Sequence, residues 1–155
     1  KDYRNYLNFF TKFDMWSEVF PGSKINTELV DSKDFVVVIA NLFKNENPDG
    51  LEKRLVQEYR IDSQIASKVV FLIRLLELTP DTAFDLHKSK LQCHIEDKTI
   101  LEWFRALGIN DPVKIKFVEY KPTTSAQELM SRGLKGKALG DEIKRIEIEN
   151  FKKML

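Results

Sequence analysis

The most continuous apolar stretch of the chain runs from Arg60 to Leu78. Its apolar residues cover most of a helical circumference, and polar residues interrupt them mainly at spacings of three or four. A helix this apolar must pack against neighbours on nearly every side. Asp62 or Ser63 can cap its N-terminus by accepting from a free backbone N–H. Thr79-Pro80 ends it, because the residue before a proline avoids the helical region. We therefore expect this stretch to be the central helix of the domain.

Helical spacing also organises the chain before this stretch. Aromatic residues recur three or four apart between Tyr3 and Phe13, which predicts an amphipathic helix with an aromatic face. The segment Phe35–Phe43 begins with FVVVIA, which has high strand propensity. Its apolar spacing is nevertheless helical, and a lone strand would leave its backbone unpaired. We predict a helix here, capped by Ser32 or Asp31.

Capping signals mark shorter helices after the central one. Asp97 can cap a helix over Lys98–Leu107 by accepting from its first turn. Asp111-Pro112 opens another helix that runs through Tyr120, since proline is well tolerated at the first helical position. These signals extend the helical pattern to residue 120.

A linker and a tail are predicted after this point. The segment 121–124, KPTT, has the composition of a linker. Ser125 and Glu128 have the spacing of a capping box, and a charged helix then runs through Met154. We predict an all-α fold: a multi-helix body built around a central buried helix (residues 1–121) and a small helical tail (residues 122–155).

Composition restricts the function only weakly. The chain has 25 basic and 24 acidic residues, so its net charge of +1 demands no polyanionic partner and any nucleic-acid contact must come from a local patch. Cys93 is the single cysteine, which excludes an intrachain disulfide and a thiolate metal cluster. We see no signal peptide or transmembrane run and expect a reducing, cytoplasmic setting. The chain begins at Lys1 inside a predicted helix, from which we expect a fragment of a longer protein.

Candidate catalytic groups are few. His87 and His94 lack the helical spacing of a metal-binding pair, and no phosphate-binding or dinucleotide-binding glycine motif is present. Cys93 and His94 are neighbours, but adjacent side chains usually point apart, and a nucleophilic thiol needs a base placed by the fold. A small structural cysteine is favoured, and we predict no catalytic residue and no metal ligand.

One basic segment stands out, just before the last helix. Arg132, Lys135 and Lys137 surround Gly133 and Gly136. Glycines let a backbone approach a ligand closely, and the free N–H groups of a helix start favour a phosphate. The pattern is typical of a sugar-phosphate clamp that does not read bases. The alternative is a helical corner whose glycines only turn the chain and whose lysines are solvated.

The order of segments resembles the C-terminal part of class II tRNA nucleotidyltransferases, the CCA-adding enzymes, and of the related bacterial poly(A) polymerases. Three stretches carry the resemblance: YLNFF with MWSEVFP between Tyr6 and Pro21, the helical succession from Phe35 to Ser63 with LEKR at Leu51–Arg54, and LKGKALG at Leu134–Gly140. The resemblance covers nearly the whole chain.

The resemblance implies a function. In that family a head holds the nucleotidyl-transfer chemistry with its metal-binding aspartates, and a neck reads the incoming nucleotide. None of those motifs is in this chain, which would be the end of the neck, the body and the tail. The resemblance implies a non-catalytic region that grips the acceptor arm and T-loop of tRNA, with tRNA and the upstream head and neck as partners and no membrane. It implies no cofactor here and Mg²⁺ in the parent enzyme's head.

The resemblance also points to particular residues. It places Lys135, Gly136, Lys137 and Gly140 near the position where the family meets tRNA. In the body, Lys53, Arg54 and Lys68 could line one further side facing the RNA.

A different class of function stays open beside this one. The chain could be a helical protein–protein scaffold whose apolar surfaces, above all the aromatic N-terminal face, dock another domain. The residues that would distinguish CCA addition from poly(A) addition lie outside the sequence.

Overall fold

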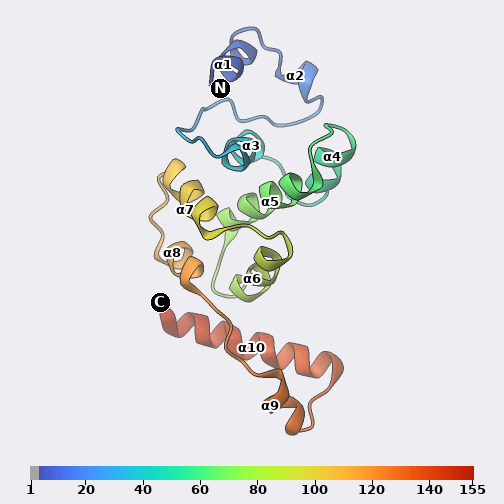
Figure 1. The fold of residues 1–155 in the computed structure, drawn as a ribbon, viewed down its shortest axis with the longest axis vertical. Helices are drawn as coiled ribbons and strands as arrows, with labels where there is room; N and C mark the ends of the chain where they lie inside the picture. Colours follow the sequence, from blue (N-terminus) through green and yellow to red (C-terminus); the bar gives the residue numbers. More distant parts are fainter. Residues whose placement is uncertain (1–3) are drawn as a thin grey trace.

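The computed structural model describes residues 4–155, which form a stack of mostly short helices with no strand among them (Figure 1). The all-α prediction is confirmed. The elements in chain order are α1 (Arg4–Lys12), α2 (Trp16–Val19), α3 (Phe35–Phe43), α4 (Leu51–Gln57), α5 (Ser63–Arg74), the 3-10 turn η1 (Leu75–Glu77), α6 (Ala83–Gln92), α7 (Asp97–Ala106), α8 (Pro112–Glu119), α9 (Ala126–Ser131) and α10 (Gly136–Met154).

The predicted central helix is present as α5, which continues into η1. Asp62 caps it, because one of its carboxylate oxygens accepts from Gln64 N (2.9 Å) and Ile65 N (3.2 Å). α5 packs against α3, α4 and α6, so its apolar residues are covered on several sides, as a helix of this composition requires. α6 then separates α5 from α10 in the stack (Figure 1).

The segment with strand propensity is helix α3, as its spacing predicts. It is covered by α5 and α7, and no neighbouring strand exists among the described residues to pair with it. The predicted cap is wrong, however: Asp34 caps α3 by accepting from Val36 N (2.9 Å), while Ser32 Oγ accepts from Asp34 N (3.1 Å). The second Asp34 oxygen accepts from Thr99 Oγ1 (2.9 Å), which ties the start of α3 to α7.

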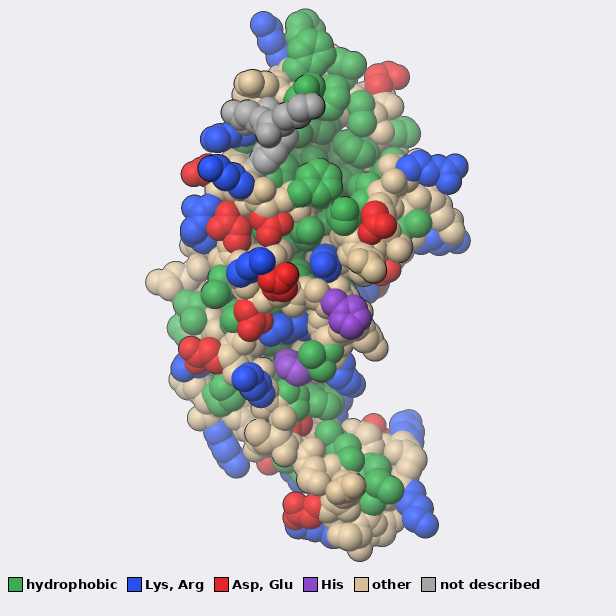
Figure 2. Space-filling model, viewed as in Figure 1, with side chains coloured by type: hydrophobic (Ala, Val, Ile, Leu, Met, Phe, Trp, Pro, Cys, Tyr) green, Lys and Arg blue, Asp and Glu red, His purple; other side chains and the backbone are tan. Residues whose placement is uncertain are grey.

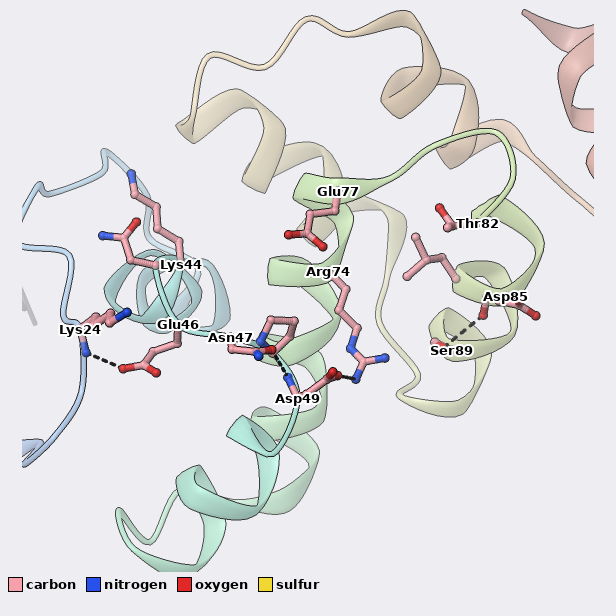
Figure 3. Close-up of a pocket in the computed structure, with 13 residues that line it drawn as sticks. Lys24, Lys44, Glu46, Asn47, Asp49, Arg74, Glu77, Thr82, Asp85 and Ser89 are labelled. Atoms are coloured by element: carbon pink, nitrogen blue, oxygen red, sulfur yellow. Dashed lines mark hydrogen bonds and ion pairs between the residues drawn. The ribbon is translucent and has the colours of Figure 1, made fainter.

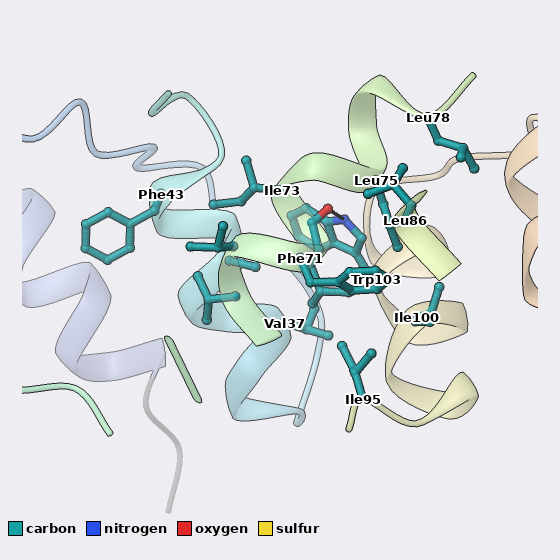
Figure 4. Packing of buried hydrophobic residues seen from close by; sticks show 14 of the residues in the cluster. Val37, Phe43, Phe71, Ile73, Leu75, Leu78, Leu86, Ile95, Ile100 and Trp103 are labelled. Atoms are coloured by element: carbon teal, nitrogen blue, oxygen red, sulfur yellow. Dashed lines mark hydrogen bonds between the residues drawn. The ribbon is translucent and has the colours of Figure 1, made fainter. Parts of the chain in front are cut away.

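Trp103 of α7 fixes the centre of the core (Figure 4). Its indole is fully buried, and its Nε1–H donates to the carbonyl oxygen of Leu72 (2.9 Å). This bond ties the backbone of α5 to α7, while the ring fills the space between the two helices. The surrounding buried side chains come from helices far apart in the sequence, including Val37 and Ile100.

The other helix starts follow the sequence only in part. Asp111 caps α8 by accepting from Val113 N (2.8 Å), as predicted. The Asp97 cap is wrong: α7 begins at Asp97 itself, whose carboxylate pairs with Lys90 instead. Of the N-terminal aromatic helix, residues from Arg4 onward form α1, and Tyr3 lies outside the described residues.

We expect Leu72→Ala to destabilise the protein far more than Leu101→Ala. Leu72 is fully buried in α5, whereas Leu101 is 49% exposed on α7. Truncating a buried leucine removes its transfer free energy and leaves a cavity, which costs about 2–5 kcal/mol. The surface substitution should stay within roughly 0.5 kcal/mol. Urea unfolding followed by circular dichroism measures both, and equal losses would contradict the central role of α5.

Candidate nucleic-acid interface

The tail corner, which we define as residues 132–137 between α9 and α10, presents backbone and charge to solvent. Gly133 and Gly136 adopt positive φ angles of 89° and 55°, a conformation that glycine reaches without strain. Lys135 precedes the first residue of α10, and no side chain caps this helix start. The free N–H groups of the first turn are therefore open to a ligand.

The basic side chains of the tail corner differ in their partners. Arg132 pairs with Glu128 (2.5 Å) in an exposed i,i+4 contact. The side chains of Lys135 and Lys137 are exposed, and neither has an ion pair or hydrogen bond with any residue from 4 to 155. The predicted capping box is half formed: Ser125 Oγ accepts from Glu128 N (3.4 Å), but the Glu128 carboxylate turns to Arg132.

Gly140 lies one turn into α10, on the same face as Gly136. A Cβ atom at either position would meet no other atom within 4 Å. Glycine inside a helix costs about 1 kcal/mol relative to alanine, and packing gives no reason for it at Gly140. An open glycine face beside two free lysines lets a ligand backbone approach the helix closely.

A buried carboxylate, Glu147 of α10, holds the segment that enters the tail. Its side chain is fully buried, and it accepts from Tyr120 OH (2.7 Å), Thr123 N (2.9 Å), Thr124 N (2.6 Å) and Thr124 Oγ1. Burial by itself disfavours the charged form, but the hydrogen bonds from Thr124 and Tyr120 outweigh it, so the pKa of Glu147 lies below its ordinary value of 4.5. The predicted linker is thus fixed to α10 rather than free.

Further contacts dock α10 on α6. The Tyr120 ring meets Phe151 of α10 and His87 of α6 edge to face, at centroid distances of 5.0 and 5.4 Å. Lys144 pairs with Asp85 (2.5 Å) and Lys152 with Asp81 (2.7 Å). Contacts therefore cross the predicted boundary between body and tail, and the boundary itself stays a prediction.

The predicted body residues lie away from the tail corner, on α4 and α5, with α6 in between (Figure 1). Lys53 is exposed and Lys68 half-buried, and neither has an ion pair among the described residues. Arg54 points into an internal network instead, where it contacts Glu46 (3.1 Å), Ser23 (2.7 Å) and Tyr59 (3.1 Å). The structure does not bring these three residues together with the tail lysines in one patch.

An exposed aromatic face lies at the N-terminal end of the stack. Tyr6, Phe9 and Phe13 of α1 and its C-terminal turn are 64%, 50% and 56% exposed, and the rings of Phe9 and Phe13 lie 4.6 Å apart. Figure 2 shows hydrophobic side chains gathered over this end of the molecule. Large apolar patches of this kind often mark contact with another protein.

The side chains considered for catalysis lack the setting that a catalytic role requires. Burial raises the pKa of the Cys93 thiol, which keeps it protonated near neutral pH and disfavours a nucleophilic role. Burial also lowers the pKa of His87, whose ring packs on Tyr120 rather than on an acid. Within the residues that the structure describes, no three His, Cys, Asp or Glu side chains gather as a metal site would need.

Two features of this region were not predicted from the sequence. One is the role of Glu147, which in sequence is one of several acids on a charged helix. The other is a pair of adjoining cavities beside α5, of about 720 and 490 Å³.

No helix of the described chain is long and apolar enough to cross a bilayer.

We expect Glu147→Gln to destabilise the protein by about 1–3 kcal/mol near pH 7, because an amide cannot accept all four hydrogen bonds and its NH₂ group loses a partner. The folded-state pKa of Glu147 lies below the unfolded one, so its contribution is present above about pH 4.5 and is lost as the pH falls through the folded pKa. The gap between wild type and variant should therefore narrow in acid.

Urea unfolding at a series of pH values measures this gap. Glu149→Gln on the same helix is the matched control, because Glu149 is exposed in an ion pair with Arg145 and should matter little. If the difference in unfolding free energy between wild type and Glu147→Gln stays constant down to the lowest pH at which the protein is folded, Glu147 is not a charged, hydrogen-bonded carboxylate.

No family model, curated protein or solved structure matches this chain. The resemblance to tRNA nucleotidyltransferases therefore rests on the segments quoted from the sequence, and it stays a prediction.

Proposed function

We propose that this chain is a non-catalytic RNA-binding region that grips folded RNA by its sugar-phosphate backbone at the tail corner. The proposal takes up the resemblance to the C-terminal body and tail of tRNA nucleotidyltransferases, in which this region would hold tRNA during CCA addition to its 3′ end. The catalytic head and neck, and the Mg²⁺ that the head uses, belong to that parent enzyme. The residues of this chain do not distinguish this region from the corresponding region of a poly(A) polymerase.

The observation that carries the proposal is the pair of lysines without partners, Lys135 and Lys137. Most arginines and many lysines of the described chain are held by acids, such as Arg74 by Asp49 and Arg145 by Glu142 and Glu149. The two tail lysines instead flank an uncapped helix start with an open glycine face. Free cations and free N–H groups together favour a phosphate.

The way in which the tail is held supports recognition by shape. The hydrogen bond from Tyr120 to Glu147 and the ion pair between Lys144 and Asp85 fix α10 on the body. A rigidly placed corner presents its charges at a set distance from the rest of the surface. Folded RNA is recognised mainly through such shape and backbone contacts, so a weakly charged chain can still be selective for one RNA geometry.

We expect a tRNA-like stem–loop RNA to bind with salt-sensitive affinity, and Lys135→Ala/Lys137→Ala to weaken it by roughly tenfold or more. Two phosphate contacts are lost, so the slope of log affinity against log salt should fall by about two. Filter binding at rising salt measures both quantities.

The matched control is Lys12→Ala/Lys33→Ala, which removes the same charge from exposed positions of the N-terminal half. It should bind RNA as wild type does. Absence of salt-sensitive binding by the wild type, or equal effects of the two double variants, would refute the tail corner as the binding site.

The exposed aromatic face favours a second candidate, a helical scaffold that docks another protein. On this hypothesis the chain self-associates through apolar contact and Phe9→Ser/Phe13→Ser restores a monomer, because charged or polar groups in such a patch oppose association. Multi-angle light scattering measures the mass of both. Association without RNA affinity favours the scaffold, and a monomer that binds RNA favours the first proposal.

A further inference from the structure

A groove of about 490 Å³ runs along one face of α5 and is closed on its far side by the end of α6. Ser63, Ser67, Val70 and Arg74 line it from α5, and their spacing of three or four places them in one row. The row is about 16 Å long at 1.5 Å per residue. The far wall includes Ser89, Gln92 and Cys93. We call this the α5–α6 groove.

The α5–α6 groove has an apolar floor and mostly neutral polar walls. Val70 and Phe71, which form the floor, are 5% and 3% exposed. The amides of Gln64 and Gln92 line the walls, and neither side chain has a hydrogen-bond partner within residues 4–155. A nucleobase combines apolar faces with hydrogen-bonding edges, and a side-chain amide can pair with such an edge.

The groove has few charged neighbours. Glu52 is the one acid that lines it, and Arg74 marks the end where it meets the second cavity. Glu52 and Lys68 are both close enough to Cys93 for their opposite charges to act on the thiol. These two charges oppose each other there, so the groove suits an uncharged group that carries its negative charge at the Arg74 end.

Arg74 links the groove to the larger cleft of about 720 Å³ between the loop 44–49 and α6 (Figure 3). Its guanidinium pairs with Asp49 (3.0 Å), whose side chain is 81% exposed on the loop. An exposed ion pair of this kind is worth little, and a phosphate can replace the carboxylate on the planar guanidinium. Glu77 and Asp85 also line the cleft, so the place for a phosphate is limited to the Arg74 end.

An ion pair joins the cleft to the helix that carries the tail corner. Asp85, which lines the cleft, pairs with Lys144 of α10. Lys144 lies two turns after Gly136 and one turn after Gly140, on the same helical face. The distance along α10 from Lys144 back to the helix start is about 12 Å. The tail corner therefore begins about 12 Å along α10 from the residue that pairs with the cleft.

We propose that the α5–α6 groove holds the base of an unpaired nucleotide of the RNA, with the phosphate of that nucleotide on Arg74. The inference rests on the proposed RNA-binding function and deepens it. It assigns a base-holding site to the body, whereas the tail corner grips backbone alone. The RNA must then present an unpaired nucleotide beside its helical part, as a bulge or a single-stranded end does.

Cys93 allows a direct test, because it is the only cysteine and it lines the groove. We expect nucleoside monophosphates at saturating concentration to slow alkylation of Cys93 by iodoacetamide by about fivefold or more, since the bound base covers the thiol. An RNA stem–loop with an unpaired 3′ extension should protect Cys93 equally, and a blunt stem–loop should not. Mass spectrometry of the modified chain measures the rates.

The test variant is Gln64→Ala/Gln92→Ala. Both glutamines are exposed, so we expect the fold to be preserved, and circular dichroism checks it. The variant should lose protection by monophosphates and bind the extended RNA about tenfold more weakly, because two hydrogen bonds are gone. It should bind the blunt RNA as wild type does. Gln57→Ala, an exposed glutamine on α4 outside the groove, is the control and should change neither.

The outcomes separate the two proposals. If monophosphates protect Cys93 but the protein binds no RNA, the groove is a nucleotide site whose ligand is not RNA. That result overturns both this inference and the proposed function. Salt-sensitive RNA binding through Lys135 and Lys137, with no protection of Cys93 by either ligand, overturns the groove and leaves the proposed function standing. Protection that survives in the Gln64→Ala/Gln92→Ala variant also overturns the groove site.

Discussion

Burial of α5 on several sides is the constraint on which the rest of the structure depends. Its apolar residues leave only a narrow polar face, so α3, α4 and α6 are all placed by the need to cover it. Trp103 completes this cover from α7 and donates to the Leu72 carbonyl of α5. The remaining polar face, with Ser63, Ser67 and Arg74, becomes one wall of a groove because α6 covers only part of it.

The second constraint is the carboxylate of Glu147. A buried charge is costly unless donors surround it, and here the tyrosine hydroxyl and the backbone of the linker supply them. Burial, and after it the hydrogen bond to the Glu147 carboxylate, raises the pKa of the Tyr120 hydroxyl. The result is a tail whose position is fixed at its entrance, while the tip at residues 132–137 stays open to solvent.

The distribution of charge distinguishes structural from available basic residues. Arg54, Lys144 and Lys152 are bound to acids and hold elements together. Lys135 and Lys137 hold nothing in the described part of the chain and stand beside a helix start with free N–H groups. A net charge near zero is thus compatible with a local anion-binding surface, because most opposite charges cancel in pairs elsewhere.

The sequence by itself determined the helical class, the central helix, the helical identity of Phe35–Phe43 and the cap at Asp111, and it limited the cap of the central helix to Asp62 or Ser63. These follow from local spacing and from bonds that span two or three residues. It did not determine which acid caps α3 or that Asp97 pairs with Lys90, because several acids compete within a few residues. The sequence treated Arg54, Lys135 and Lys137 alike as basic residues that could face RNA. The tertiary structure showed that Arg54 is bound to Glu46, whereas the side chains of Lys135 and Lys137 are free. The four hydrogen-bond donors to Glu147 come from residues more than twenty positions earlier in the chain, so only the tertiary structure could reveal them. The groove beside α5 likewise depends on how the helices pack.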